Sequence, residues 1–139
     1  MQKGHSDTLT DGVRVRVGAL YIPEQSDPDR GRYVYAYRVE IGNEGDQPVR
    51  LVSRHWIILD AIGERRDVRG EGVVGQQPWI QPGGSFEYTS GCQLETSWGS
   101  MEGSYRMERA DGESFDAVVG RFFLARNVAP PSRVRAARR

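Results

Sequence analysis

Three glycines, Gly70, Gly72 and Gly75, have the spacing most typical of a chemical site, because they form the pattern Gly-x-Gly-x-x-Gly. In a dinucleotide-binding loop this pattern opens a helix whose N-terminal amides hold a pyrophosphate. Pro78 and Pro82 follow too closely for such a helix to form. A nest of backbone N–H groups can still hold a phosphate without a helix. The chemistry open to this segment is therefore anion binding on a loop.

Positive charge lies directly upstream of these glycines. The candidate anion site consists of the three glycines together with Arg65, Arg66 and Arg69, whose guanidinium groups would donate hydrogen bonds to a phosphate or pyrophosphate. A structural loop explains the same residues, because glycine also serves wherever a turn needs positive φ. We expect the structural loop, and binding of a phosphate compound or nucleotide is the alternative.

The sequence gives less support to a metal site. His5 and His55 are the two histidines, and neither has a histidine partner two or four residues away. Asp27 and Asp29 flank a proline, a pattern that the backbone chemistry of a turn explains. A metal site needs several oxygen or imidazole ligands that converge on one point. We therefore expect neither a metal site nor a cofactor.

Nucleophilic catalysis finds no recognisable motif either. Cys92, the single cysteine, follows a glycine and is expected to be a small buried hydrophobe rather than a thiolate. Four serines near Cys92 in the sequence lack the residues of a nucleophile elbow; they are Ser90, Ser97, Ser100 and Ser104. The chain is expected not to be an enzyme.

Two tryptophans suggest a protein-binding surface. Trp79 and Trp98 lie in Gly- and Pro-rich connections, whereas Trp56 belongs to an apolar run typical of a core strand. Tryptophan is enriched at the energetic centres of protein interfaces, so Trp79, Trp98 and Met101 form the candidate interaction surface. In the simpler interpretation the two tryptophans cap the ends of the fold.

The candidate site residues must be positioned by the elements that the rest of the sequence forms, and its main pattern is short runs of alternating apolar and polar residues. The runs are separated by Gly, Pro, Asn and Asp, which predicts strands joined by turns. About seven antiparallel strands favour an all-β fold, an immunoglobulin-like or fibronectin-III-like β-sandwich. The predicted strands cover residues 13–17, 33–41, 49–60, 65–69, 86–89, 104–108 and 115–125.

The 139 residues predict one domain over 13–126, between a flexible N-terminus over 1–12 and a disordered basic tail over 127–139. The formal net charge is zero, which gives no electrostatic reason to expect a nucleic acid or an anionic membrane as partner. A single cysteine, the lack of an apolar signal segment and the lack of roughly 20 consecutive apolar residues indicate a cytoplasmic protein without a membrane span.

Several ordered motifs resemble one family. They are Asn43-Glu44, Arg54-His55-Trp56, residues 70–78, Pro82-Gly83, Tyr88 to Cys92, residues 99–103 and Tyr105. On these residues the chain resembles the ApaG family over most of its length, from about Val13 to Arg126. The resemblance implies a fibronectin-III-like sandwich, and it brings no catalytic mechanism.

The resemblance also implies a genetic association with cobalt and magnesium tolerance and with diadenosine tetraphosphate metabolism. In eukaryotic relatives the domain is regarded as a protein-interaction module. We therefore expect a non-enzymatic binding or adaptor module with an indirect effect on metal tolerance. Its expected partner is another protein. The alternative partner is a phosphate-containing small molecule bound at the 70–75 loop.

Overall fold

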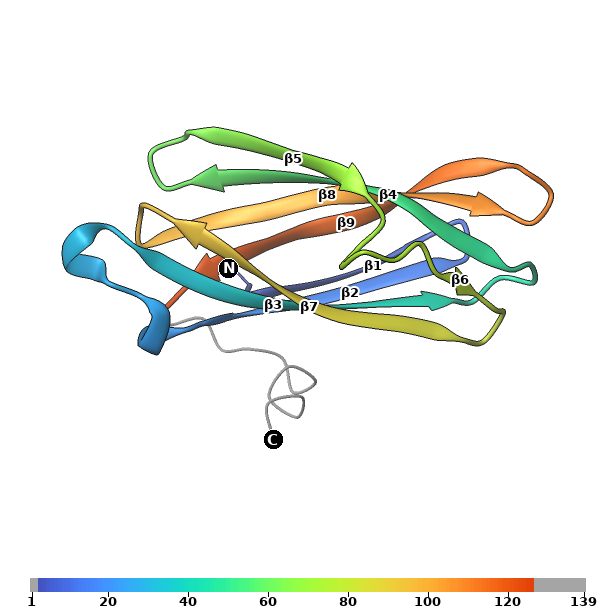
Figure 1. Cartoon of the computed structure of the whole chain (residues 1–139), viewed down its shortest axis with the longest axis horizontal. Helices are drawn as coiled ribbons and strands as arrows, with labels where there is room; N and C mark the ends of the chain where they lie inside the picture. Colours follow the sequence, from blue (N-terminus) through green and yellow to red (C-terminus); the bar gives the residue numbers. More distant parts are fainter. Residues whose placement is uncertain (1–2, 127–139) are drawn as a thin grey trace.

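The computed structural model describes residues 3–126, so the predicted basic tail over 127–139 lies outside the described residues. The described chain forms two antiparallel sheets stacked as a sandwich (Figure 1). The prediction of an all-β sandwich is confirmed. Two strands that the alternation did not predict, β1 and β6, bring the described total to nine.

One sheet has four strands in the order β1-β2-β3-β7. Its strands are β1 (His5–Thr10), β2 (Val13–Tyr21), β3 (Tyr33–Asn43) and β7 (Ser85–Leu94). The other sheet has the order β5-β4-β8-β9, with β6 paired to β4. Its strands are β4 (Val49–Asp60), β5 (Arg65–Glu71), β6 (Trp79–Ile80), β8 (Trp98–Arg109) and β9 (Ser114–Ala125). Two short 3-10 turns, η1 (Pro23–Gln25) and η2 (Pro28–Arg30), connect β2 to β3.

Strand β1 corrects the prediction of a flexible N-terminus over 1–12. It pairs with β2 at six positions, from His5 opposite Gly18 to Thr10 opposite Val13. Asp11 and Gly12 connect the two strands with φ values of 47° and 85°. Positive φ at both central residues is the geometry that an Asp-Gly turn favours in a two-residue hairpin. The hairpin signal was thus in the sequence, although the polar residues of β1 hid the strand.

The core lies between the sheets, where alternate residues of the long strands point inward. Trp56 on β4 is at its centre and is 3% exposed, as predicted for a core tryptophan. Its ring meets Tyr37 at 5.3 Å between centroids, and Tyr105 and Phe122 at 6.0 Å each, in edge-on geometry. Such edge-to-face contacts are a favoured arrangement of aromatic rings. The contact between Trp56 and Tyr37 therefore joins the two sheets in the core, because β4 and β3 belong to different sheets.

The two long edges of the sandwich differ. At the edge between β1 and β9, called the closed edge, the Ser6 hydroxyl donates to the Gly120 carbonyl at 2.7 Å. The Val118 amide donates to Thr10 Oγ1 at 3.2 Å, and the Phe123 amide donates to the Lys3 carbonyl at 2.7 Å. Hydrogen bonds thus join the two sheets along this edge.

The opposite edge, between β5 and β7, is called the open edge. Within the described chain, the hydrogen bonds that join these two strands come from one side chain, Arg66. Its Nη2 lies 3.2 Å from the Gln93 carbonyl oxygen and 3.8 Å from Cys92 Sγ.

No helix in residues 3–126 is long and apolar enough to cross a bilayer.

Candidate functional site

Part of the backbone that the predicted phosphate nest of the 70–75 loop needs is already hydrogen-bonded. The Gly72 amide donates to the Val52 carbonyl at 2.8 Å, and Val73 and Gln76 exchange two backbone hydrogen bonds of 2.8 Å. Amides that already donate to backbone carbonyls are not available to a phosphate. The chain then continues to β6, a strand rather than a helix. The segment is a structural loop, which agrees with the simpler of the two interpretations.

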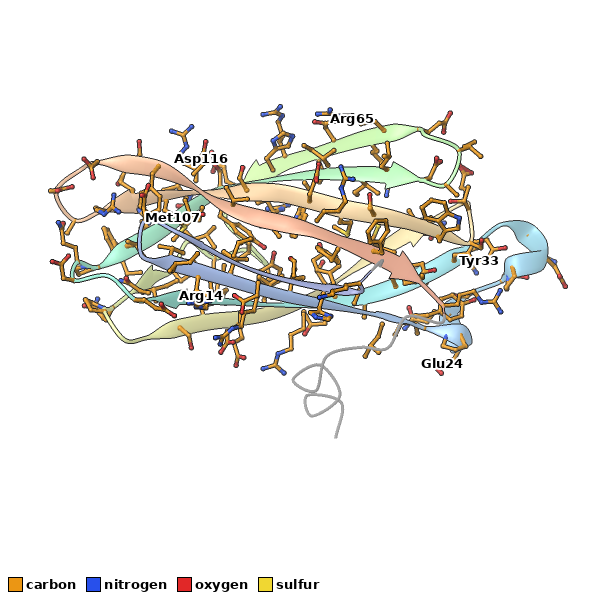
Figure 2. The ribbon with its side chains drawn as sticks, turned by 180° about the vertical axis from the view of Figure 1, so that it is seen from behind. Arg14, Glu24, Tyr33, Arg65, Met107 and Asp116 are labelled. Carbon is orange, nitrogen blue, oxygen red and sulfur yellow. The ribbon has the colours of Figure 1, made fainter. Side chains whose placement is uncertain are left out.

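The three arginines of the predicted anion site are divided between the two faces of β5, because successive side chains of a strand point to opposite faces. Arg65 and Arg69 belong to the outer face of the sheet, and Figure 2 shows Arg65 pointing away from the sandwich. Arg66 lies on the inner face, where its exposed side chain lines the opening between the sheets. The six residues predicted as one anion site therefore do not meet at one place.

The outer-face residues form an ion-pair cluster instead. Arg65 Nε lies 2.7 Å from Asp67 Oδ1, and His55 Nε2 lies 2.8 Å from Asp67 Oδ2. Hydrogen bonds from Arg65 and His55 hold the pKa of the Asp67 carboxyl well below its usual range. Ser104 is the cross-strand neighbour of His55, yet no hydrogen bond joins these two side chains in the described structure. The cluster therefore lacks the serine–histidine contact that a nucleophilic triad needs.

Metal-binding side chains do not gather elsewhere in residues 3–126. No group of three or more His, Cys, Asp or Glu side chains in that range has an arrangement that could hold a metal ion. Asp27 instead forms an ion pair with Arg30 at 3.5 Å beside the 3-10 turn η2.

The predicted interaction surface of Trp79, Trp98 and Met101 is wrong as a single surface. Met101 is 1% exposed, because it points inward from β8 into the core. Trp79 is 48% exposed and pairs with Arg50, near the start of β4. Trp98 is 41% exposed and precedes Gly99, which pairs with Asp60 at the end of β4. About ten residues at roughly 3.3 Å each separate those ends. The two tryptophans therefore lie at opposite ends of the sandwich.

A cleft of about 240 Å³ opens between the sheets at the open edge, and we call it the β5–β7 cleft. Its two charged residues are Arg54 on β4 and Arg66 on β5. The other lining residues, polar and apolar, are Tyr37, Trp56, Ile58, Val68, Ser90, Gly91, Cys92, Gln93 and Met101. No acidic residue contributes to this lining.

Arg54 is the site residue that the sequence analysis missed. Its Nη1 donates to the carbonyls of Glu71 at 3.2 Å and Gly72 at 2.8 Å. The guanidinium lies against Gly70, where an added Cβ would be 2.7 Å from Nη2. The signal that could have found Arg54 is its spacing, because it precedes the inward-facing Trp56 by two residues and must share that face.

The remaining polar groups of the cleft are neutral at ordinary pH. Burial raises the pKa of the Cys92 thiol, and the nearby Arg66 only partly opposes this effect. Burial likewise raises the pKa of the Tyr37 hydroxyl, against a hydrogen bond with Ser90. Cys92 is 7% exposed, which confirms the prediction of a buried cysteine. Two guanidinium groups thus supply the charge of the cleft.

A second hollow, of about 370 Å³, lies on the outer face of the four-stranded sheet and includes Asn43 and Glu44. Asn43 is 2% exposed, and its Nδ2 donates to the carbonyls of Gln47 at 2.8 Å and Ile80 at 2.9 Å. Its Oδ1 accepts from the Gly45 amide at 2.9 Å. This asparagine therefore joins the connection between β3 and β4 to strand β6, which is a structural role.

Comparison with known proteins agrees with this architecture. Residues 23–109 match a family model described as the ApaG domain. The chain is 53% identical to Protein ApaG of Anaeromyxobacter dehalogenans over 119 residues, which cover 86% of this chain and 94% of that protein. It is 51% identical to Protein ApaG of Dechloromonas aromatica over 120 residues, with the same two coverages.

A solved structure has the same fold. The crystal structure of the putative ApaA protein from Bordetella pertussis superposes with a TM-score of 0.81 at 44% sequence identity. The match covers 93% of this chain and all of that chain. The family model, the two relatives and this structure all span most of the sandwich, so the chain belongs to the ApaG family.

Proposed function

We propose that this chain is a non-enzymatic, cytoplasmic binding module that holds an extended segment of another protein along the outer edge of β7. The observation that carries the proposal is the unpaired backbone of that strand. β7 pairs with β3 at ten positions and with no other strand of the described chain. Addition of a strand to an exposed sheet edge is a recurring mode of peptide recognition.

The sequence of β7 also suits this role. Exposed edge strands are commonly protected from pairing by proline, lysine or a bulge. β7 has neither proline nor lysine, and Glu87 is its single charged residue. Its pairing register with β3 runs without a shift from Ser85 to Leu94. A partner strand would therefore find a long, regular row of hydrogen-bonding groups.

The direction of the free groups follows from two hydrogen bonds. The Asn43 amide of β3 donates to the Gly84 carbonyl, so the backbone carbonyl of Gly84 points toward β3. The Gln93 carbonyl accepts from Arg66 and therefore faces away from β3. Because backbone groups alternate along an antiparallel strand, the N–H groups of Glu87, Thr89 and Gly91 point outward with Gln93.

Two further features favour binding over catalysis. The thiol of Cys92 has a raised pKa because it is buried, and His55 is hydrogen-bonded to Asp67 rather than to Ser104. The cobalt and magnesium tolerance associated with the family would then arise indirectly, through the bound partner. Phosphate or nucleotide binding at the 70–75 loop is disfavoured, because the Gly72, Val73 and Gln76 amides donate to backbone carbonyls.

The test is a proline at position 89. Thr89→Pro removes an outward N–H group while the ladder with β3 keeps its donors, and edge strands tolerate proline at such positions. Thr89→Ala is the matched control, because it changes the same side chain and keeps the N–H. Each variant is immobilised and exposed to a lysate of the source organism, and captured proteins are quantified by mass spectrometry.

We expect the wild type and Thr89→Ala to retain the same protein at comparable levels, and Thr89→Pro to lose it at least tenfold. Circular dichroism and the melting temperature show whether Thr89→Pro remains folded. Equal capture by a folded Thr89→Pro variant would contradict the proposal. Failure of the wild type to retain any protein above a blank support would also contradict it.

A further inference from the structure

We infer that the β5–β7 cleft is a binding site for a small organic anion, a molecule with one carboxylate or phosphate group on an apolar body. The guanidinium groups of Arg54 and Arg66 would hold the acid group, and the apolar wall of the cleft would cover the body. This inference does not rest on the proposed function, because it concerns the space between the sheets, although Arg66 also donates to the outward Gln93 carbonyl of β7.

The first argument is unbalanced charge. Several arginines on the outer faces pair with carboxylates: Arg14 lies 2.7 Å from Glu44, and Arg65 lies 2.7 Å from Asp67. Neither Arg54 nor Arg66 forms an ion pair with a carboxylate of residues 3–126. In a chain of zero net charge, the cleft thus holds two positive charges and no acidic lining residue. Positive charge in a partly enclosed site attracts anions more strongly than the same charge in open water.

The second argument is the availability of donors. The hydrogen bonds of Arg54 within the described chain come from Nη1, which leaves the N–H groups of Nε and Nη2 for a ligand. Glu71 and Gly72 fix the guanidinium, and Gly70 leaves room for it. A planar guanidinium with two parallel N–H groups matches the geometry of a carboxylate or phosphate. Because the protein already fixes this group, a ligand loses little binding free energy in ordering it.

The third argument is the wall of the cleft. Trp56, Ile58 and Met101 are buried, and Val68 packs against the core beside them. Ligand pockets combine such apolar walls with a few polar groups that fix orientation. The volume of about 240 Å³ lies below the usual pocket range of about 300–1,000 Å³. The site therefore suits a body about the size of one ring.

The probes are phenyl phosphate and benzoate, with inorganic phosphate as the probe that lacks an apolar body. Each is titrated into ¹⁵N-labelled protein, and amide and arginine Nε signals are followed by NMR. We expect saturable shifts at the Arg54 Nε and at the amides of residues 66–70 and 90–93. Inorganic phosphate is expected to bind at least threefold more weakly than phenyl phosphate. The Val74 and Gly75 amides are expected to keep their positions, which separates this site from the 70–75 loop.

Two variants of the same strand identify the charge that matters. Arg66→Gln is expected to weaken phenyl phosphate binding about tenfold. Arg69→Gln, which removes an equal charge from the outer face of β5, is expected to change it less than twofold. Arg54→Lys keeps the charge but loses the planar donors, and it is expected to weaken binding about tenfold while circular dichroism shows the fold intact.

Equal weakening by Arg66→Gln and Arg69→Gln would overturn the inference, because it would indicate attraction to general surface charge. Equal affinities for phosphate and phenyl phosphate would overturn the role of the apolar wall. Absence of saturable shifts with both organic probes at millimolar concentration would overturn the site itself. Thr89→Pro is expected to bind the probes like the wild type, so a failure of the proposed function leaves this test unaffected.

Discussion

An added Cβ atom would have different surroundings at each of the three glycines of the 70–75 loop. At Gly72 it would lie 2.1 Å from the Gln76 carbonyl oxygen, and the residue has a φ of 61°. At Gly75, where φ is 79°, nothing lies within 4 Å of the added atom. At Gly70 the obstacle is the guanidinium of Arg54, the end of a long side chain. An alanine at Gly72 thus tests steric overlap, one at Gly75 tests backbone strain alone, and one at Gly70 tests the position of the Arg54 guanidinium.

Replacement of each glycine by alanine should therefore have unequal effects on the free energy of unfolding, measured with urea. We expect Gly72→Ala to lose the most, roughly 4 kcal/mol, because a fixed carbonyl cannot move away. Gly75→Ala should lose about 1 kcal/mol, the cost of a left-handed backbone for a residue with a Cβ. Gly70→Ala should lose roughly 2 kcal/mol, and it should also weaken anion binding because Arg54 must move. Equal losses at Gly72 and Gly75 would contradict this account.

The thiol of Cys92 provides a test of the non-enzymatic expectation. Burial raises its pKa, so at neutral pH the thiolate fraction is smaller in the folded chain than in the unfolded chain. We expect alkylation by iodoacetamide at pH 7 to be at least tenfold slower than in denaturing urea. The rate for the folded protein should still be rising at pH values where the unfolded thiol has already ionised. Faster alkylation of the folded protein at pH 7 would indicate an activated nucleophile instead.

At the scale of elements, the strands with a strong alternation were predictable and the polar ones were not. Tyr33 to Ile41 alternates clearly, and that segment is β3, at an inner position of its sheet. β1 was missed because pairing with β2 and side-chain hydrogen bonds to β9 stabilise it, rather than burial of its own apolar residues. Met101 was misassigned to an exposed connection because β8 begins earlier, at Trp98.

Deletion of residues 1–10 tests the contribution of β1. The deletion removes six paired positions of β2 and the hydrogen bonds of the closed edge. We expect the melting temperature, measured by differential scanning calorimetry, to fall by roughly 10 °C or more. Leu9→Ser is the control, because Leu9 is 52% exposed and its replacement should change the melting temperature little. An unchanged melting temperature after the deletion would restore the prediction of a flexible terminus.

The candidate site shows the limit of sequence reasoning at this scale. The spacing of two residues between Arg54 and Trp56 could have placed Arg54 on the inner face, but the sequence did not show that Arg66 approaches the same space from β5. That proximity depends on the pairing of β4 with β5, in which Arg54 is opposite Gly70 and Ile58 is opposite Arg66. Strand pairing, and not spacing along the chain, brings these two arginines together, so their proximity could be recognised only from the structure.

Across the whole molecule, the closed and open edges should differ in amide hydrogen exchange. On β9, the Val118 and Phe123 amides donate to Thr10 Oγ1 and to the Lys3 carbonyl, although β9 is the last strand of its sheet. On β7, the outward amides of Glu87 and Thr89 face no strand of the described chain.

We expect the Val118 and Phe123 amides to exchange at least tenfold more slowly than the Glu87 and Thr89 amides. The measurement is hydrogen–deuterium exchange followed by NMR, with rates corrected for the intrinsic exchange of each amide. Similar protection at both edges would mean that β7 is covered in solution. In that case its backbone would not be free to receive a partner strand.

The contact between Lys3 and Phe123 has a practical consequence for attaching the protein to a sensor or a label. This contact places the start of the described chain beside β9, on the side of the molecule that faces away from the β5–β7 cleft. A linker joined ahead of Lys3 would therefore leave the wall formed by β5 and β7 directed toward the solution. Attachment through a lysine or cysteine introduced on β7 would do the opposite and would hide the groups that the proposed interactions need.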